Sequence, residues 1–302
     1  MDGENLSRRT VLGGLGAAAV PLIAGCTPVP DGPVPPASAA YGGTGAASTA
    51  APASLPFRAT FLEHMGTVVP DVTAATVFHS RLFNPAIMTE NAPPLRLYVD
   101  LKPGYLAFGS RANEPRAFFD HFCVLLDDWD RDAVAAALEA DGFAPNPAFM
   151  LVQDPDGIGV QYYSHPGGWF PTVIPADPLV DGPSLVEPRG LAHVMLNVAD
   201  MDAALAYYRR YFGMLDERDD ADVAWFVFPD NEQPTRLGLR AAPDGVPPSI
   251  DHIGVRVAPF DHAGLAEALV AMGAGVAPAA GSAGERLAFT DPMGLKLELV
   301  AV

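Results

Sequence analysis

The greater part of this 302-residue chain repeats itself, and the repeat limits the folds that the chain can adopt. Residues 62–84 can be laid over residues 191–213 without a gap, at an offset of 129. Residues 120–161 can be laid over 251–298, at an offset of 131 at the start and 137 at the end. This drift fits insertions in the loops between matched elements. We therefore predict that the chain beyond its N-terminal segment consists of two similar halves.

Each half divides again into two similar units. Every unit opens with a short strand that carries one histidine, and these histidines are His64, His121, His193 and His252. A helix-like stretch follows, and in the third unit Asp200 or Asp202 is placed to cap apolar residues at helical spacing over 204–212. The second and fourth units end in an Asp-Pro-x-Gly turn and a closing strand, at 158–163 and 295–300. We therefore predict an α+β fold of four βαβββ units.

The first 56 residues have a different character. Arg8 and Arg9 precede a short apolar stretch that ends in Leu-Ile-Ala-Gly-Cys26, and residues 1–26 thus resemble a twin-arginine signal peptide with a bacterial lipobox. A buried helix is the alternative interpretation. The resemblance implies export in the folded state, cleavage before Cys26 and lipidation of its sulfur. The protein would then be a lipoprotein on the outer face of the bacterial cytoplasmic membrane. Residues 27–56, rich in Pro, Ala, Gly and Ser, predict a flexible linker.

Composition excludes several other classes of protein. The formal net charge is −18 and no cluster of Lys and Arg occurs, so general nucleic-acid binding is not expected. The chain has two cysteines, Cys26 and Cys123, which is too few for a disulfide scaffold. No apolar run reaches the ~20 residues of a membrane-spanning helix. A lipid on Cys26 is therefore the expected link to a membrane, and the sequence leaves the oligomeric state open.

Motifs in the C-terminal half resemble a known superfamily. They are Leu-Ala-His-Val at 191–194, Tyr-Arg-Arg-Tyr-Phe-Gly-Met at 208–214, Ile-Asp-His-Ile-Gly at 250–254 and Thr-Asp-Pro-Met-Gly-Leu-Lys-Leu-Glu-Leu at 290–299. Together with the repeat, they are similar to the vicinal-oxygen-chelate superfamily, which includes glyoxalase I, extradiol ring-cleavage dioxygenases and bleomycin-resistance proteins. The resemblance extends over 57–302. It implies two tandem domains, expected at 57–164 and 190–302 with a linker at 165–189, whose sheets curl around a metal-centred cavity.

The resemblance also implies a set of metal ligands. In the C-terminal domain it points to His193, His252 and Glu298, and two histidines with one carboxylate leave coordination positions open for substrate and oxidant. A solvent-facing Glu298 beside Lys296 is the alternative. The matching N-terminal residues are His64, His121 and Gln161, of which the amide is the poorest ligand.

Other residues are expected to line these cavities. Asn197 and Arg256 each follow a ligand histidine by four residues, so they are expected on its face of the strand, where either could hold a substrate oxygen. A place on the cavity rim is the alternative. Cys123 follows His121 by two residues and could approach the N-terminal site, although a buried cysteine is usually a small apolar residue.

The chemistry implied first is that of an oxidoreductase. A divalent metal, Fe(II) by preference, with Mn(II) or Zn(II) as alternatives, would bind a small, aromatic substrate through two vicinal oxygens beside O₂. One departure argues against standard catechol cleavage: the acid–base histidine and tyrosine of extradiol enzymes are missing near Arg236–Gly238 and Ala288–Phe289. A glyoxalase-like isomerase or lyase using Zn(II) or Ni(II), and a lipoprotein that binds a small molecule without catalysis, are the alternatives.

Overall fold

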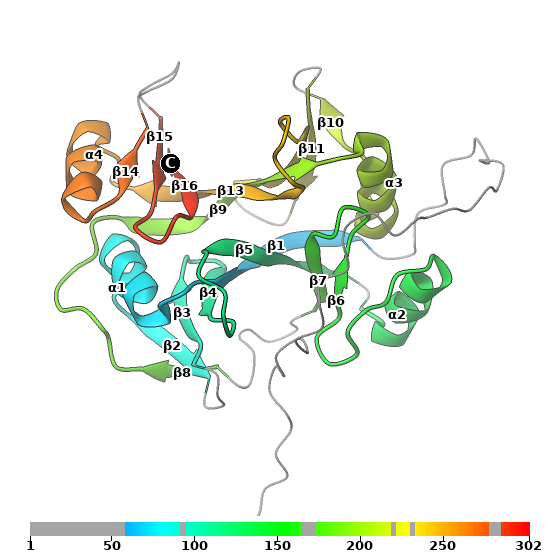
Figure 1. Cartoon of the computed structure of the whole chain (residues 1–302), viewed down its shortest axis with the longest axis horizontal. Coiled ribbons are helices and arrows are strands. Elements are labelled where there is room, and N and C mark those ends of the chain that lie inside the picture. Colours follow the sequence, from blue (N-terminus) through cyan, green and yellow to red (C-terminus); the bar gives the residue numbers. More distant parts are fainter. Residues whose placement is uncertain are drawn as a thin grey trace, which may run out of the picture.

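The computed structural model describes residues 58–90, 95–127, 129–164, 173–218, 222–229, 233–277 and 285–302. The predicted signal peptide at 1–26 with Cys26, and the predicted linker at 27–56, lie outside the described residues. The described part is built from two eight-stranded sheets and four helices (Figure 1).

The first sheet is formed by the N-terminal half. Its strand order is β6-β7-β5-β1-β4-β3-β2-β8. Central β1 pairs antiparallel with β5 and parallel with β4, while β5 pairs parallel with β7. The strands are β1 (Ala59–Val68), β2 (Ile87–Glu90), β3 (Leu97–Asp100), β4 (Tyr105–Gly109), β5 (Phe118–Leu126), β6 (Leu151–Gln153), β7 (Gly159–Tyr163) and β8 (Val173–Ala176).

The second sheet repeats this arrangement in the C-terminal half. Its order is β10-β11-β12-β9-β13-β16-β15-β14, and β9 pairs antiparallel with β13 and parallel with β12, while β13 pairs parallel with β16. The strands are β9 (Glu187–Val198), β10 (Glu217–Arg218), β11 (Val223–Phe228), β12 (Thr235–Ala241), β13 (Ser249–Ala258), β14 (Gly275–Val276), β15 (Arg286–Thr290) and β16 (Lys296–Ala301). The prediction of an α+β fold with repeated strand–helix–strand units is confirmed.

Each unit contains one helix, and an aspartate precedes each of the four described helices. In α1 (Val72–Leu82), α2 (Arg131–Ala140) and α3 (Met201–Phe212) this aspartate accepts a hydrogen bond from a backbone N–H in the first turn, whereas Asp261 before α4 (His262–Ala271) makes no such bond. These caps explain why α1, α2 and α3 each begin one residue after an aspartate. Gly213, with φ of 64°, ends α3 in the left-handed conformation.

The predicted linker over 165–189 is not a linker throughout. Residues 173–176 form β8, which pairs antiparallel with β2 at the edge of the first sheet, and β9 already begins at Glu187. This added strand pairs with the backbone hydrogen-bonding groups at the edge of β2. Its Val-Ile-Pro-Ala sequence is apolar, as is common in strands. In the second unit, two described strands, β6 and β7, follow the helix instead of the expected three.

The two sheets pack on each other through their central strands. β5 contacts β13, and β1 contacts β11 and β12, so the apolar faces of both sheets share one core (Figure 1). Rings of α3 fill the space between the sheets: Tyr208 and Phe212 contact Phe122 of the first sheet and Phe226 of the second.

Two buried hydrogen bonds join the halves in a pseudo-symmetric manner. His79 of α1 lies 3.0 Å from the Asp291 carboxylate in the turn before β16. Tyr208 of α3, the repeat equivalent of His79, donates to the Asp154 carboxylate before β7 at 2.7 Å. Each Asp-Pro-x-Gly turn is therefore held by a helix of the other half. Among the described helices, none is long and apolar enough to cross a membrane.

Candidate metal centre

Three adjacent strands bring the predicted C-terminal ligands together. His193 lies on β9, His252 on β13 and Glu298 on β16, and both His193 and Glu298 are in register with Gly254 of β13. A side chain at Gly254 would block this arrangement, because a Cβ there would lie 2.3 Å from the His193 ring. The glycine in Ile-Asp-His-Ile-Gly therefore makes room for a ligand imidazole of the neighbouring strand.

The geometry of the three side chains fits a divalent cation. One ligand atom from each of His193, His252 and Glu298 lies within 4.8 Å of the others. The centroids of the two imidazole rings are 5.2 Å apart and the ring planes meet at 85°. His193 Nε2 is 3.5 Å from Glu298 Oε2. This carboxylate oxygen is buried and has no hydrogen-bond partner. A buried carboxylate oxygen without a donor is costly, and a metal ion would supply the missing charge.

Electrostatics keep His193 in the form that binds metals. Burial, together with the nearby His252 and three arginines, lowers the pKa of His193 to about 3, so its imidazole is neutral at physiological pH. Neutral imidazole is the metal-binding form. The ring centroids of Trp225 and His193 are 6.2 Å apart, and the planes of the two rings meet at 81°.

An aspartate orients the second histidine. His252 Nδ1 donates a hydrogen bond to Asp251 Oδ2 at 2.8 Å, which leaves Nε2 as the nitrogen for a metal. The hydrogen bond with His252, and a further one from Lys296, lower the pKa of Asp251 and keep it ionised. A register shift between Ile250 and His252 lets these neighbours meet, although successive strand residues normally point to opposite faces.

Asn197 and Arg256 both form hydrogen bonds within the protein. The Asn197 amide donates to Asp251 at 3.4 Å and accepts from Arg240 at 2.9 Å. The buried Arg256 guanidinium donates to the backbone carbonyls of Leu191, at 2.5 Å, and Pro234. These bonds give Asn197 a place in the network behind His252 and make Arg256 a link between strands, and a contact of either residue with a substrate oxygen stays a prediction.

Sequence reasoning missed Asp251 as a functional residue. The signal was present, because an acidic residue directly precedes three of the four strand histidines. In all three pairs, which are Glu63–His64, Asp120–His121 and Asp251–His252, the carboxylate contacts the histidine Nδ1 at 2.8 to 3.0 Å. His193 follows an alanine and lacks this partner.

A small pocket of about 160 Å³ opens beside the triad. His252, Lys296 and Glu298 contribute its polar atoms, and its remaining lining is largely apolar: Ala277, Ala288, Phe289, Thr290 and Leu297. Ala288 is in register with Glu298 on the neighbouring strand. No described histidine or tyrosine other than His252 lines this pocket, which agrees with the missing acid–base residues noted in the sequence.

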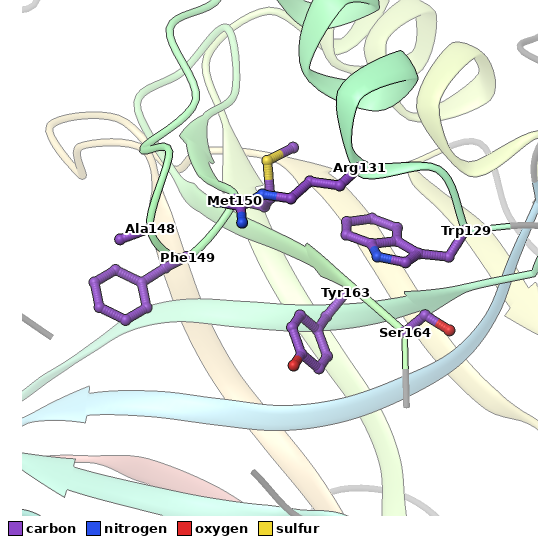
Figure 2. A pocket seen from close by; sticks show the side chains of 7 residues that line it. All are labelled: Trp129, Arg131, Ala148, Phe149, Met150, Tyr163 and Ser164. Carbon is purple, nitrogen blue, oxygen red and sulfur yellow. The ribbon is translucent and has the colours of Figure 1, made fainter. Parts of the chain in front are cut away.

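The N-terminal half repeats the histidine pair, and its third predicted ligand, Gln161, has a further partner. The rings of His64 and His121 are 5.5 Å apart at 85°, close to the geometry of their C-terminal counterparts. Gln161 differs, because its amide N–H donates to the Phe149 carbonyl at 2.9 Å. Phe149 in turn lines a separate pocket of about 200 Å³ between the start of α2 and the end of β7 (Figure 2). Gln161 is thus tied to this loop.

Comparisons with known proteins place this geometry in context. Residues 190–299 match the model of the Glyoxalase/Bleomycin resistance protein/Dioxygenase superfamily. No curated protein matches the sequence.

Solved structures show the same fold. The chain is similar to the Mn(II)-bound glyoxalase from Novosphingobium aromaticivorans, with a TM-score of 0.58 and 17% identity over 81% of this chain and 83% of that one. It is also similar to a catechol 2,3-dioxygenase, with a TM-score of 0.56 and 17% identity over 81% and 88% of the two chains. The 2,3-dioxygenase LapB from Pseudomonas sp. KL28 is similar with a TM-score of 0.56 and 12% identity, over 81% of this chain and 93% of that one. Residues 190–299 of the chain therefore match the glyoxalase, bleomycin resistance protein and dioxygenase superfamily, and 81% of the chain shares its two-sheet fold with these solved structures.

Proposed function

We propose that the protein is a metal-dependent enzyme of the dioxygenase type, which binds a small substrate through two vicinal oxygens at His193, His252 and Glu298. The observation that carries the proposal is the buried Glu298 oxygen, which has no hydrogen-bond donor and lies 3.5 Å from a neutral imidazole. Two histidines and one carboxylate are a ligand set typical of Fe(II) oxygenases, and Mn(II) and Zn(II) also accept it.

The residues of the site have separate tasks in this proposal. A divalent metal, when bound, supplies Lewis acidity toward substrate oxygens and a coordination position for O₂. Asp251 holds the His252 ring in one orientation, and burial keeps His193 unprotonated at physiological pH. Phe289 and Ala288 form an apolar wall beside Glu298, which suits an aromatic or aliphatic carbon skeleton.

The charge around the site favours an anionic substrate. The positive charges of Arg286, Arg256 and Arg236 all act on His193, and Arg286 lies 3.9 Å from Glu298. Lys296 lines the pocket itself. These cations, with the carboxylates of Asp251 and Glu298 among them, contrast with the net charge of −18 for the chain. We infer a substrate whose vicinal oxygens carry negative charge, such as an ionised catechol or a hydroxy acid.

Metal content and oxygen uptake test the proposal together. The chain, purified without oxygen or chelators, is expected to hold iron or manganese at this site and to consume O₂ with catechols. Glu298→Ala is expected to lose this metal and all turnover, whereas Glu285→Gln, an exposed glutamate just before β15, is expected to lose neither. A Glu298→Ala variant that retains full metal content and turnover would refute the assignment of the triad.

A second candidate is a glyoxalase-like isomerase or lyase. The specific observation in its favour is that Ala288, rather than a tyrosine or histidine, stands opposite Glu298, so the acid–base group of extradiol cleavage has no counterpart there. Under this proposal, zinc, nickel or manganese supports turnover of an α-hydroxy or α-keto substrate without oxygen. Turnover under anaerobic conditions separates the two candidates. Ligand binding that is unchanged in Glu298→Ala, with no turnover of any substrate, would instead indicate a binding protein.

We also propose that the chain is exported by the twin-arginine route and anchored by a lipid on Cys26. The support is the order of Arg8 and Arg9, a short apolar stretch and the cysteine. Cys26→Ser is expected to abolish incorporation of labelled fatty acid, and Lys substitutions at both arginines are expected to block export. Full export of the double arginine variant would contradict the proposed route.

A further inference from the structure

The first sheet contains a second group of metal-binding side chains, which differs from the N-terminal set expected from the repeat. It consists of Glu63 and His64 on β1 and Cys123 on β5. His64 and Cys123 face each other directly in the β1–β5 ladder. A register shift between Leu62 and His64 brings Glu63 alongside them, as a similar shift brings Asp251 to His252 in the second sheet.

The three side chains are close together and removed from solvent. One ligand atom from each lies within 4.8 Å of the others. Glu63 is 8% exposed, His64 3% and Cys123 0%. Glu63 Oε2 is 3.0 Å from His64 Nδ1, and the same carboxylate hydrogen-bonds the Cys123 thiol. A carboxylate, an imidazole and a thiol thus meet in a buried space, where a bound cation would offset the cost of burying the carboxylate charge.

The two halves of the repeat carry different residues at the positions that form this group. Cys123 corresponds to Gly254, the residue that leaves room for the His193 ring in the C-terminal half. In the N-terminal half, this position carries a sulfur that faces the corresponding His64. Gln161, the counterpart of Glu298, is engaged by the Phe149 carbonyl. The N-terminal half therefore keeps both histidines of the pattern and places a new thiol and a new carboxylate beside one of them, His64.

We propose that Glu63, His64 and Cys123 form a second metal site, distinct from the C-terminal triad, which binds Zn²⁺ or another thiolate-preferring divalent ion. Thiolate and imidazole select zinc-like ions, while magnesium and calcium prefer sites made only of oxygen. Tetrahedral coordination places ligand atoms about 3.5 Å apart, so the group has to contract by little more than 1 Å. On binding, the Cys123 S–H bond breaks, its proton leaves to solvent and an S–metal bond forms, with no change of oxidation state.

Burial assigns a structural task to this site. Its three ligands are nearly closed to solvent, whereas His252 and Glu298 of the first site line an open pocket. Closed zinc sites stabilise a fold and open ones support catalysis, and a fourth ligand from the protein or one water would complete a closed tetrahedral site here. The bound ion would tie β1 to β5, the central pair of the first sheet and a part of the contact with the second. His121, whose ring is 5.5 Å from that of His64, lies at the margin of the site.

Cobalt titration of the full chain tests the proposal, because Co²⁺ bound to a thiolate shows a near-ultraviolet charge-transfer band. The Cys26→Ser background leaves Cys123 as the sole cysteine of the chain. In this background we expect two equivalents of Co²⁺ and the thiolate band. Adding Glu298→Ala is expected to remove one equivalent and keep the band. Adding Cys123→Ser instead is expected to remove the band and the other equivalent.

A conservative variant guards against misfolding of a chain altered at a buried cysteine. Glu63→Gln keeps the size of the side chain and removes its charge, so we expect the band to remain and the Co²⁺ dissociation constant to rise at least tenfold. Absence of the thiolate band in the Cys26→Ser chain would overturn the proposal, as would a band that persists after Cys123→Ser. The Glu298→Ala chain lacks the first site, so the thiolate band in this variant reports on the second site alone. Failure of the proposed enzymatic function therefore does not change the result expected for the second site.

Discussion

Asp154 is expected to make the folded chain less stable as the pH rises, and the substitution Asp154→Asn measures this effect. The carboxylate is 4% exposed and lies in the turn before β7. One oxygen accepts hydrogen bonds from the backbone N–H groups of Asp156 and Ile158, and the other accepts from Tyr208 of the opposite half. Asparagine preserves the size of the side chain, its acceptor oxygen toward the turn and a polar contact with the tyrosine hydroxyl.

The magnitude follows from the pKa. Burial raises the pKa of Asp154 from 3.8 to about 6, although the hydrogen bonds from Tyr208 and Ile158 act in the opposite direction. The folded chain therefore binds this proton more tightly than the unfolded chain does. The resulting stability is present below pH ~4 and is lost as the pH rises through about 6. A difference of about two pKa units corresponds to about 3 kcal/mol at pH 7.

Urea unfolding at a series of pH values from 4 to 8, with chelator present, is the assay. Other groups titrate in this range, so the informative quantity is the free energy of unfolding of the wild type minus that of Asp154→Asn. We expect this difference to fall by about 2.5 kcal/mol between pH 4 and pH 7, since a small part of the total is already lost at pH 4. Tyr208→Phe removes a hydrogen bond that lowers the pKa of Asp154, so the fall is expected to extend to higher pH in that variant.

A difference that stays constant across the pH range would refute the reasoning, since it would mean that Asp154 has the same pKa in both states. A difference that increases with pH would show that the tyrosine and backbone hydrogen bonds outweigh burial and hold the carboxylate ionised.

Three further substitutions test other contacts. Asp251→Asn removes the carboxylate that orients His252, so metal affinity at the triad is expected to fall about 10- to 100-fold. Isothermal titration measures this affinity, and an unchanged value would exclude the orienting role. His79→Ala leaves Asp291 buried without its partner and is expected to cost about 3–5 kcal/mol in urea unfolding, whereas a cost below 1 kcal/mol would mean that the pair contributes little. Gly254→Ala places a methyl group where an imidazole lies, so metal binding is expected to be lost while circular dichroism stays native; full metal content would show that the ring can move aside.

The repeated architecture could be predicted from the sequence because it depends on local features. The histidine-bearing strands, the aspartates before the helices and the Asp-Pro-x-Gly turns recur at nearly constant offsets. Cap and turn residues act over a few positions, so their effect can be read without knowing what packs against them. The convergence of His193, His252 and Glu298 was an expectation from family resemblance, and the described strands bring these three residues together.

Tertiary structure alone decided the remaining features. β8 could not be distinguished from a linker, because its pairing partner β2 lies more than eighty residues earlier in the chain. The His79–Asp291 contact joins residues 212 positions apart, and neither residue carries a local signal of it. The approach of Glu63 to His64 and Cys123 depends on an irregular strand register, which alternation along a strand does not predict. Local patterns thus determined the units, whereas long-range packing and small shifts of register determined which side chains meet.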